Sequence, residues 1–222
     1  MRYYPVFLDL AGKPVIVIGG GHVAYQKMIN LVKAGAVTTV VAPELNADMA
    51  TLKAEVKFQH VEREYQAGDL EGYLLAFVAT DDGAINSVVA GEARERAIWV
   101  NAVDDVPNCD FIMPGIATRG DITIAISTAG RSPALARKLR ETIEQEFLTD
   151  QWQRMLDLCA EVRADLRDRG IVIDPDIWSA ALDEPLRRMV AEERLGQAKG
   201  RLLKSLGVGV RMTPPAPAKA EA

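Results

Sequence analysis

A triplet of glycines between an apolar segment and a helical pattern is the feature that most constrains the fold. Residues Pro14–Ile18 are rich in β-branched side chains, which predicts a buried strand. From residue 23 to residue 34 apolar side chains recur at roughly helical spacing, and Gly35 then ends the predicted helix. A strand, a glycine turn and a helix in this order predict the first unit of a nucleotide-binding sheet.

Residues 19–24 read Gly-Gly-Gly-His-Val-Ala and fit the pattern G-x-G-x-x-A. Gly19 permits a tight turn, Gly21 lets the backbone approach a pyrophosphate, and Ala24 lets helix and strand pack closely. The helix N-terminus adds free N–H groups and a partial positive charge. We therefore predict dinucleotide binding, with His22 contacting the ligand through its backbone. The alternative is a glycine-rich turn that binds nothing.

Two later positions bear on which nucleotide binds. An acidic residue about 20 positions beyond the glycines often binds the ribose 2′-hydroxyl, and Glu44 is the candidate here. Residues 41–50 contain no Arg or Lys to receive a 2′-phosphate, so we expect NAD in preference to NADP. Glu44 has an alternative role as a solvated residue in the first turn of the next helix. Thr80 follows the apolar segment 74–79, where doubly wound sheets place ligand-facing groups, although it could also cap the following helix.

An alternation of strands and helices sets the expected fold class of the first half of the chain. Further strands are predicted at residues 37–42, 56–61, 74–79 and 99–103, and further helices at 45–55 and 85–96. This order is typical of an α/β protein with a mostly parallel, Rossmann-type sheet covered by helices on both faces.

The pattern changes after Pro114. Residues 116–126 predict two short strands around an Arg-Gly-Asp turn, and Ser132 before Pro133 predicts a helix start. That helix carries an apolar stripe with a spacing of four residues: Leu135, Leu139, Ile143 and Phe147. The sequence from Asp150 is charged and helical. We therefore expect a Rossmann domain at 1–113, a small α+β segment at 114–149, a helical domain at 150–212 and a disordered Pro/Ala-rich tail at 213–222.

The end of the predicted strand 99–103 holds a candidate catalytic group. Asn101 and Asp104 lie there, beside the expected cofactor crevice. A carboxylate that is partly desolvated near a nicotinamide has a raised pKa and can act as a general base. Asp104 is our candidate for that base, and the alternative is a loop aspartate that caps a turn before Val106.

A second candidate region surrounds the helix that begins after Ser132. Residues 131–140 contain four cations and no carboxylate: Arg131, Arg137, Lys138 and Arg140. Hydroxyls precede the helix at Ser127, Thr128 and Ser132. Hydroxyls, a helix N-terminus and cations together favour anion binding. The alternative is an amphipathic helix whose polar face is basic.

Composition and missing motifs exclude other classes. A formal net charge of -5 argues against a nucleic-acid-binding protein. No apolar run approaches the roughly 18 residues that span a bilayer, and the N-terminus does not read as a signal peptide. With two cysteines and two histidines in all, neither a disulfide framework nor a multi-histidine metal site is expected. No G-x-S-x-G or G-x-x-x-x-G-K-[ST] motif is present. We expect a cytoplasmic protein without a resident metal, a nucleic-acid partner or a membrane partner.

Several short segments, in order along residues 1–149, resemble the siroheme synthase family. They are residues 5–8, 17–24 with Lys27, 79–82, 101–104, 111–114 and 132–137. The resemblance implies a precorrin-2 dehydrogenase, a class in which some members are also sirohydrochlorin ferrochelatases. It implies NAD as cofactor, Fe²⁺ as the substrate of any chelation, and a homodimer formed through residues 114–149. Because no methyltransferase domain follows, the chain resembles the stand-alone enzymes.

The resemblance also implies roles for individual residues. Asp104 matches the aspartate that acts in dehydrogenation and in chelation where that occurs. His22 and Val23, together with Pro43 and Glu44, match residues that contact NAD. For the polycarboxylate precorrin-2 and its product sirohydrochlorin, we expect contacts from Asn101, Ser127, Thr128, Arg131, Ser132 and Arg137. Thr128 also falls where the fused synthase has a serine that can be phosphorylated.

One alternative function belongs to a different class. The glycine turn also fits a non-catalytic, NAD-sensing Rossmann module of the kind that regulates ion transport. That reading gives no role to residues 101–104 or 127–140.

Overall fold

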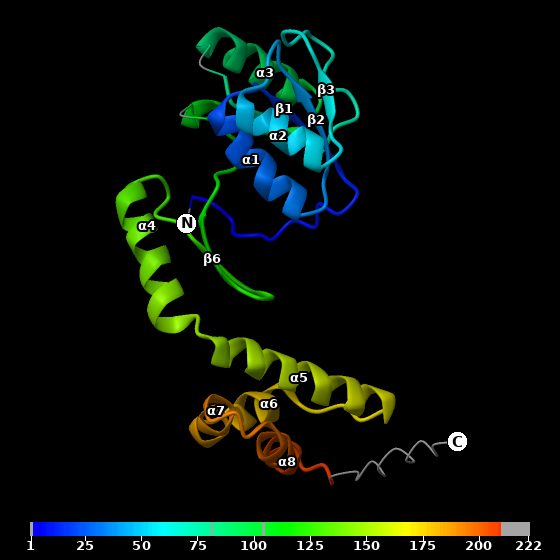
Figure 1. The fold of residues 1–222 in the computed structure, drawn as a ribbon, viewed down its shortest axis with the longest axis vertical. Helices are drawn as coiled ribbons and strands as arrows, with labels where there is room; N and C mark the ends of the chain where they lie inside the picture. Colours follow the sequence, from blue (N-terminus) through cyan, green and yellow to red (C-terminus); the bar gives the residue numbers. More distant parts are fainter. Residues whose placement is uncertain (1, 81, 104, 210–222) are drawn as a thin grey trace, which may run out of the picture. The chain divides into compact units, whose positions relative to one another are not determined.

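The computed structural model describes residues 2–80, 82–103 and 105–209 and divides between Met113 and Pro114 into two compact units (Figure 1). The first unit contains a five-stranded sheet in the order β3-β2-β1-β4-β5, with every neighbouring pair parallel. Its strands are β1 (Pro14–Ile18), β2 (Val37–Val41), β3 (Gln59–Val61), β4 (Leu75–Val78) and β5 (Trp99–Ala102). Its helices are α1 (His22–Lys33), α2 (Ala47–Glu55), α3 (Gly83–Glu95) and the short 3-10 turn η1 (Val106–Asn108). The predicted α/β class with a parallel Rossmann-type sheet is confirmed.

Apolar clusters cover both faces of the sheet. Successive side chains of a strand point to opposite sides, so a central strand such as β1 contributes to both clusters. Val15 and Val17 of β1 pack in one apolar cluster with Ala24 and Met28 of α1 and Met49 of α2. The intervening β1 residues pack in a second cluster with α3, whose buried members include Ile16, Ile18, Val89, Ala90 and Ala93. A β1 strand buried on both sides accounts for its continuous apolar sequence.

Helix caps and loop contacts adjust the predicted boundaries. The second helix begins at Ala47 because the side chain of Asn46 accepts a hydrogen bond from the Met49 N–H at 2.9 Å. The third begins at Gly83, since the Asp82 carboxylate accepts from the Ala84 N–H at 2.8 Å. The strand predicted at 56–61 is confined to Gln59–Val61, the part that pairs with β2.

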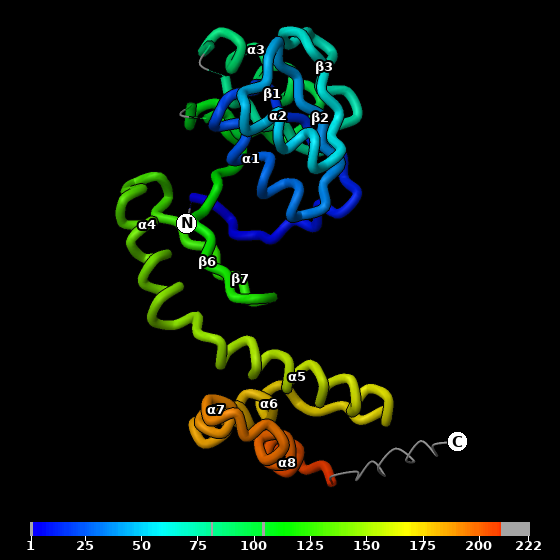
Figure 2. The backbone as a smooth tube through the Cα atoms, viewed as in Figure 1, coloured from blue at the N-terminus to red at the C-terminus, as the bar shows by residue number. Residues whose placement is uncertain are grey.

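The second unit begins with an antiparallel hairpin of β6 (Gly115–Arg119) and β7 (Ile122–Ile126), which run side by side in Figure 2. Gly120 adopts a φ of +54° in its turn, and a Cβ there would lie 2.0 Å from Oε1 of Gln153. Helix α4 (Pro133–Thr142) follows and continues as a π-helical turn, η2 (Ile143–Phe147). The hairpin predicted around Arg-Gly-Asp is confirmed.

Four further helices lie in the described part of the second unit: α5 (Asp150–Asp168), α6 (Pro175–Ala181), α7 (Glu184–Ala191) and α8 (Leu195–Ser205). Their common core is built from one face of α5, where Met155, Leu158, Val162 and Leu166 are buried at spacings of three and four residues. Leu186 of α7 and Leu202 of α8 are fully buried against the same cluster. Within the described residues, no helix is both long and apolar enough to cross a membrane.

Candidate functional site

The glycine turn between β1 and α1 leaves the N-terminus of α1 uncovered. Gly21 is the N-cap of α1 and supplies no side chain to the first-turn N–H groups. A Cβ on Gly21 would meet no described atom within 4 Å. The lack of a side chain therefore serves no internal packing and leaves the helix N-terminus open to an anion. Ala24 is fully buried against the sheet, which fits the close packing predicted for it.

The other two glycines hold neighbouring loops against the turn. Gly19 has a φ of +118°, and a Cβ there would lie 2.3 Å from the carbonyl oxygen of Ala79. A Cβ on Gly20 would lie 2.0 Å from the carbonyl oxygen of Glu44. The Gly20 carbonyl also accepts a hydrogen bond from the Asn46 N–H at 2.9 Å. Sequence reasoning gave Gly20 no role; the signal available was a third glycine where the pattern needs only two.

Glu44 and Thr80 are thereby placed on the two loops that touch the glycine turn. Glu44 and Pro43 are exposed after β2, and the carboxylate of Glu44 has no partner among the described residues. The alternative that Glu44 belongs to the first helical turn is wrong, because Asn46 caps α2 and the helix starts later. His22 and Val23 are exposed in the first turn of α1.

The Thr80 hydroxyl lies 3.1 Å from Oδ1 of the buried Asn86 and so faces the start of α3. The alternative that Thr80 caps α3 is also wrong, because Asp82 occupies that position and accepts from the helix N–H groups. A hydroxyl that donates to Asn86 keeps its lone pairs for another donor. Ligand contact by Thr80 stays a prediction.

Asp104, the predicted catalytic base, lies outside the described residues, but the backbone on either side of it is described. Asn101 is 7% exposed, and its Nδ2 donates to the carbonyl oxygen of Phe111 at 2.9 Å. This hydrogen bond connects β5 to residue 111, at the far end of the loop that follows β5, and the sequence did not predict it. Substrate contact by Asn101 stays a prediction.

Cys109 and Asp110 fasten the same loop to β5. The Cys109 thiol donates to the Ala102 carbonyl at 3.0 Å and accepts the Ala102 N–H at 3.2 Å. Asp110 accepts the Val100 N–H through Oδ2 at 2.9 Å and donates its own N–H to the Val100 carbonyl. Burial raises the pKa of the Cys109 thiol, which keeps it neutral at physiological pH. The sequence did not predict this structural role for Cys109.

The hydroxyls of the second region close the turn before α4. The Ser132 N–H donates to Oγ1 of Thr128 at 3.2 Å, and that hydroxyl lies 3.0 Å from the Ser132 carbonyl. The side chain of Ser127 accepts from the Ala129 N–H at 3.0 Å. Ser132 caps α4 by accepting from the Leu135 N–H at 3.3 Å, as predicted. These hydroxyls shape the loop, and any substrate contact would add to that role.

The predicted cluster of uncompensated cations is partly neutralised. Arg137 pairs with Glu141 at 3.0 Å and Arg140 pairs with Glu144 at 2.6 Å. Arg137 holds the pKa of Glu141 below its ordinary value. Both acids stand one helical turn after their partners, just beyond the acid-free window of residues 131–140. Within the described chain, Arg131 forms no ion pair.

These features define the class of protein. A parallel sheet with the order β3-β2-β1-β4-β5, whose first strand enters a glycine turn at a helix N-terminus, is a Rossmann-type dinucleotide-binding domain. The family model described as "Putative NAD(P)-binding" matches residues 6–115, and the one described as "Sirohaem biosynthesis protein central" matches residues 119–146. The chain belongs to the siroheme synthase family.

Individual relatives support the same assignment. The chain is 40% identical over 166 residues to a siroheme synthase of Photobacterium profundum, covering 75% of this chain and 35% of that one. It is 36% identical over 220 residues to the siroheme synthase of Methylococcus capsulatus, covering 97% and 46%. The chain thus spans less than half the length of these relatives. The solved structure of SirC, a precorrin-2 dehydrogenase, shares the fold with a TM-score of 0.71 at 24% identity, covering 90% of this chain and all of that one.

Proposed function

We propose that this protein oxidises precorrin-2 to sirohydrochlorin with NAD as the hydride acceptor, in siroheme biosynthesis. The observation that carries the proposal is the open helix N-terminus at Gly21, in a chain whose following segment matches the sirohaem central family. The glycine turn supplies the cofactor site, and the family membership supplies the substrate class.

The loop after β2 favours NAD over NADP. Glu44 is exposed directly beside the glycine turn, since the carbonyl of Glu44 contacts Gly20. A carboxylate at this position accepts hydrogen bonds from ribose hydroxyls and repels a 2′-phosphate. No Lys or Arg stands in residues 41–50 to offset that repulsion. Contacts from His22, Val23, Pro43 and Thr80 complete the proposed NAD site.

Strand register supports Asp104 as the general base. Ile18 of β1 pairs with Val78 of β4, which pairs with Ala102 of β5, so the three strands end at the same edge. The residues that follow them are Gly19, Ala79 and Val103, and Asp104 comes next in the sequence. NAD held at the glycine turn would supply the hydride acceptor for this oxidation. A carboxylate beside that edge takes the accompanying proton, and a partly desolvated site raises its basicity.

Segment 114–149 is the proposed source of substrate contacts and of the homodimer interface. Arg131 and Arg137, with Ser127, Thr128 and Ser132, are proposed to bind carboxylates of the tetrapyrrole. Leu135 is 52% exposed and Phe147 is 60% exposed on the apolar stripe of α4 and η2. Exposed apolar surface of this kind favours a self-complementary interface.

A cytoplasmic location also stays a proposal, in keeping with two free cysteines.

The direct test is turnover. Purified protein given precorrin-2 and NAD is expected to form sirohydrochlorin and NADH in equal amounts. Absence of turnover by folded protein that binds NAD would instead favour the NAD-sensing module. Fe²⁺ insertion is a second proposed step, assisted by the same carboxylate as the pyrrole protons leave. Anaerobic sirohydrochlorin with Fe²⁺, followed by absorbance, tests that step separately.

A further inference from the structure

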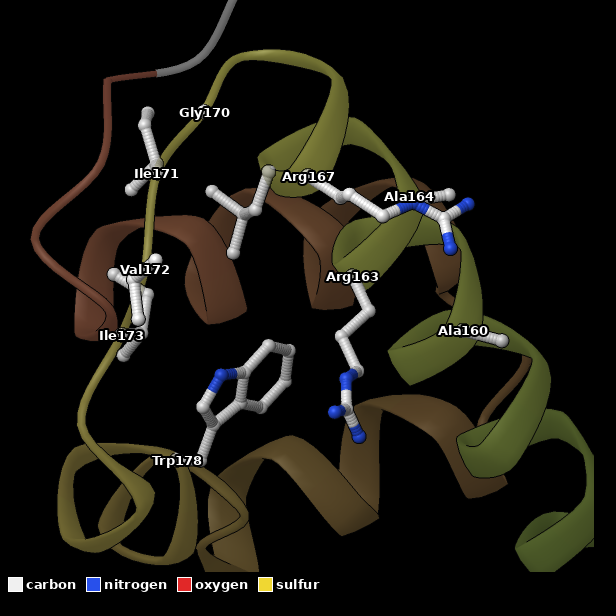
Figure 3. Close-up of a pocket in the computed structure, with 10 residues that line it drawn as sticks. Ala160, Arg163, Ala164, Arg167, Gly170, Ile171, Val172, Ile173 and Trp178 are labelled. Carbon is white, nitrogen blue, oxygen red and sulfur yellow. The ribbon is translucent and has the colours of Figure 1, made fainter.

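The helical part of the second unit contains a pocket of about 630 Å³ that the proposed function does not use (Figure 3). It lies between the C-terminal half of α5, the loop that follows and α6. Its volume is within the range of small-molecule sites. The side chains that matter for a ligand are two arginines, one tryptophan and three aliphatic residues: Arg163, Arg167, Trp178, Ile171, Val172 and Ile173.

One side of the pocket is formed by three consecutive aliphatic residues, 171–173, in the loop after α5. Ile171 and Ile173 are half-buried and pack on the helical core, as does Trp178. Val172 between them is 95% exposed. In Figure 3 the Trp178 ring projects from α6 into the pocket. One exposed valine is ordinary, but beside an aromatic ring in a pocket it extends an apolar surface that a ligand can cover.

The pocket also carries uncompensated positive charge. Arg163 and Arg167 are one turn apart on α5, a spacing at which like charges destabilise a helix. Neither guanidinium forms an ion pair or hydrogen bond with another described residue, whereas nearby Arg169 pairs with Asp165 at 3.0 Å. In Figure 3 Arg163 extends from α5 toward Trp178, and Arg167 runs along α5 beside Ala164. An anion bound here would pair with cations that have no partner among the described residues.

We propose that this pocket binds a small organic anion with a flat apolar body and a carboxylate. The body lies against Trp178 and the aliphatic loop, and the carboxylate pairs with Arg163 and Arg167. A planar guanidinium suits a carboxylate because it can donate two parallel hydrogen bonds. None of the pocket residues belongs to the proposed NAD or tetrapyrrole contacts, so this site is independent of the catalytic proposal.

The test uses a matched pair of fluorescent probes, 1-pyrenebutyrate and the neutral 1-pyrenebutanol, titrated into the full-length protein. Wild-type protein is expected to bind the carboxylate more tightly than the alcohol. Arg163→Gln and Arg167→Gln should each weaken pyrenebutyrate roughly tenfold and leave pyrenebutanol unchanged. Arg188→Gln is the matched control, because Arg188 is exposed on α7 and unpaired within the described chain.

A second variant guards against effects on folding. Ala160 is exposed on α5 at the pocket edge, so Ala160→Glu adds a negative charge without altering the core. It should weaken pyrenebutyrate while the thermal unfolding midpoint stays within a few degrees of wild type. Equal affinity for both probes, unchanged binding in the arginine variants, or displacement of pyrenebutyrate by NAD would overturn the proposal. Displacement by NAD would place the probe at the glycine turn.

Discussion

The Cys109 thiol donates a hydrogen bond to the Ala102 carbonyl at 3.0 Å and accepts the Ala102 N–H at 3.2 Å. This exchange across residues 102–109 closes the loop that contains position 104. Two further hydrogen bonds join β5 to the end of this loop. Asn101 of β5 donates to the Phe111 carbonyl, and the Asp110 carboxylate accepts the N–H of Val100 in β5. The loop beside the proposed catalytic base is therefore held by side chains at both ends.

Replacing Cys109 with alanine should loosen this loop. Cys109→Ala leaves the Ala102 N–H without its described partner, whereas the Ala102 carbonyl still accepts the Asp105 N–H at 3.4 Å. We expect a loss of about 1–3 kcal/mol in the free energy of unfolding. Cys109→Ser keeps a donor and an acceptor and should lose less. Urea unfolding measures both. NAD affinity is expected to stay unchanged, because the glycine turn adjoins β1; a loss of NAD binding in folded Cys109→Ala would contradict this separation.

The glycine turn offers a matched pair of substitutions. Gly20→Ala places a Cβ 2.0 Å from the Glu44 carbonyl oxygen, so it should destabilise the fold by about 1–3 kcal/mol or more. Gly21→Ala meets no described atom within 4 Å and has a φ of -85° that alanine adopts freely. We expect its stability to be near wild type but its NAD affinity to fall, because the methyl group occupies the approach to the helix N-terminus. Thermal unfolding and NAD titration separate the two effects.

Activity should depend on Asp104 far more than on its neighbour. Asp104→Asn removes the proposed base at nearly constant volume, and turnover of precorrin-2 is expected to fall roughly 10²–10⁴-fold with NAD binding retained. Asp105→Asn is the control, since the Asp105 carboxylate accepts a hydrogen bond from Asn108 at 2.8 Å and has a local structural role. Near-normal turnover in Asp104→Asn would remove Asp104 from the mechanism.

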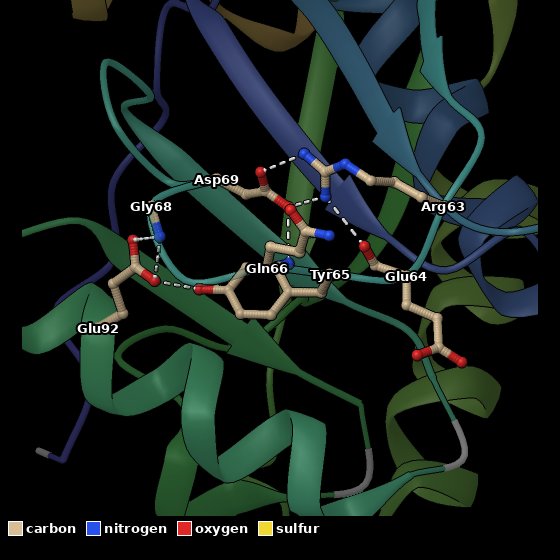
Figure 4. A network of polar contacts seen from close by, with 7 residues as sticks. All are labelled: Arg63, Glu64, Tyr65, Gln66, Gly68, Asp69 and Glu92. Carbon is tan, nitrogen blue, oxygen red and sulfur yellow. Dashed lines mark hydrogen bonds and ion pairs between the residues drawn. The ribbon is translucent and has the colours of Figure 1, made fainter.

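A polar network on the loop between β3 and β4 predicts how stability changes with pH (Figure 4). Glu92 of α3 accepts hydrogen bonds from the Tyr65 hydroxyl and the Gly68 N–H, and it pairs with Arg96 at 2.8 Å. Burial alone would raise the pKa of Glu92, but these contacts outweigh burial and lower it. The ionised form therefore stabilises the fold above the ordinary glutamate pKa, and that contribution is lost as the pH falls through the lowered value.

Tyr65→Phe tests this network. Loss of the hydroxyl should cost about 0.5–2 kcal/mol near neutral pH and should move acid unfolding to higher pH, because the pKa of Glu92 then rises. Burial and the hydrogen bond to Glu92 raise the pKa of Tyr65 itself, so its contribution persists below the ordinary tyrosine pKa and is lost as pH rises above it. Unfolding free energies measured across a pH series check both limbs. Identical acid limbs for the two proteins would contradict the assignment.

The apolar stripe of α4 and η2 predicts self-association. Leu135→Glu and Leu139→Glu place charges on exposed positions and should leave the monomer folded. Sedimentation is expected to show a dimer for wild-type protein and monomers for the double variant. A Val88→Glu control alters an equally exposed apolar residue of α3 in the first unit and should stay dimeric.

Sequence by itself determined the features that depend on neighbouring residues. The strand Pro14–Ile18, the glycine turn and α1 follow from local steric and helix-end rules. The pairing of Arg137 with Glu141 also follows from the sequence, because it needs only a spacing of four residues on one helix. Glu141 lies one residue beyond the range 131–140, which contains no acidic residue.

Tertiary structure alone decided contacts between segments whose approach no local rule fixes. Gly20 is required because the Glu44 carbonyl, after β2, lies where a Cβ would be. Cys109 has a structural role because its loop folds back and hydrogen-bonds to β5. Arg163 and Trp178 lie on different helices and meet at a pocket only once the bundle forms. Backbone preferences act over a few residues, whereas packing and hydrogen bonding between distant segments depend on the completed fold.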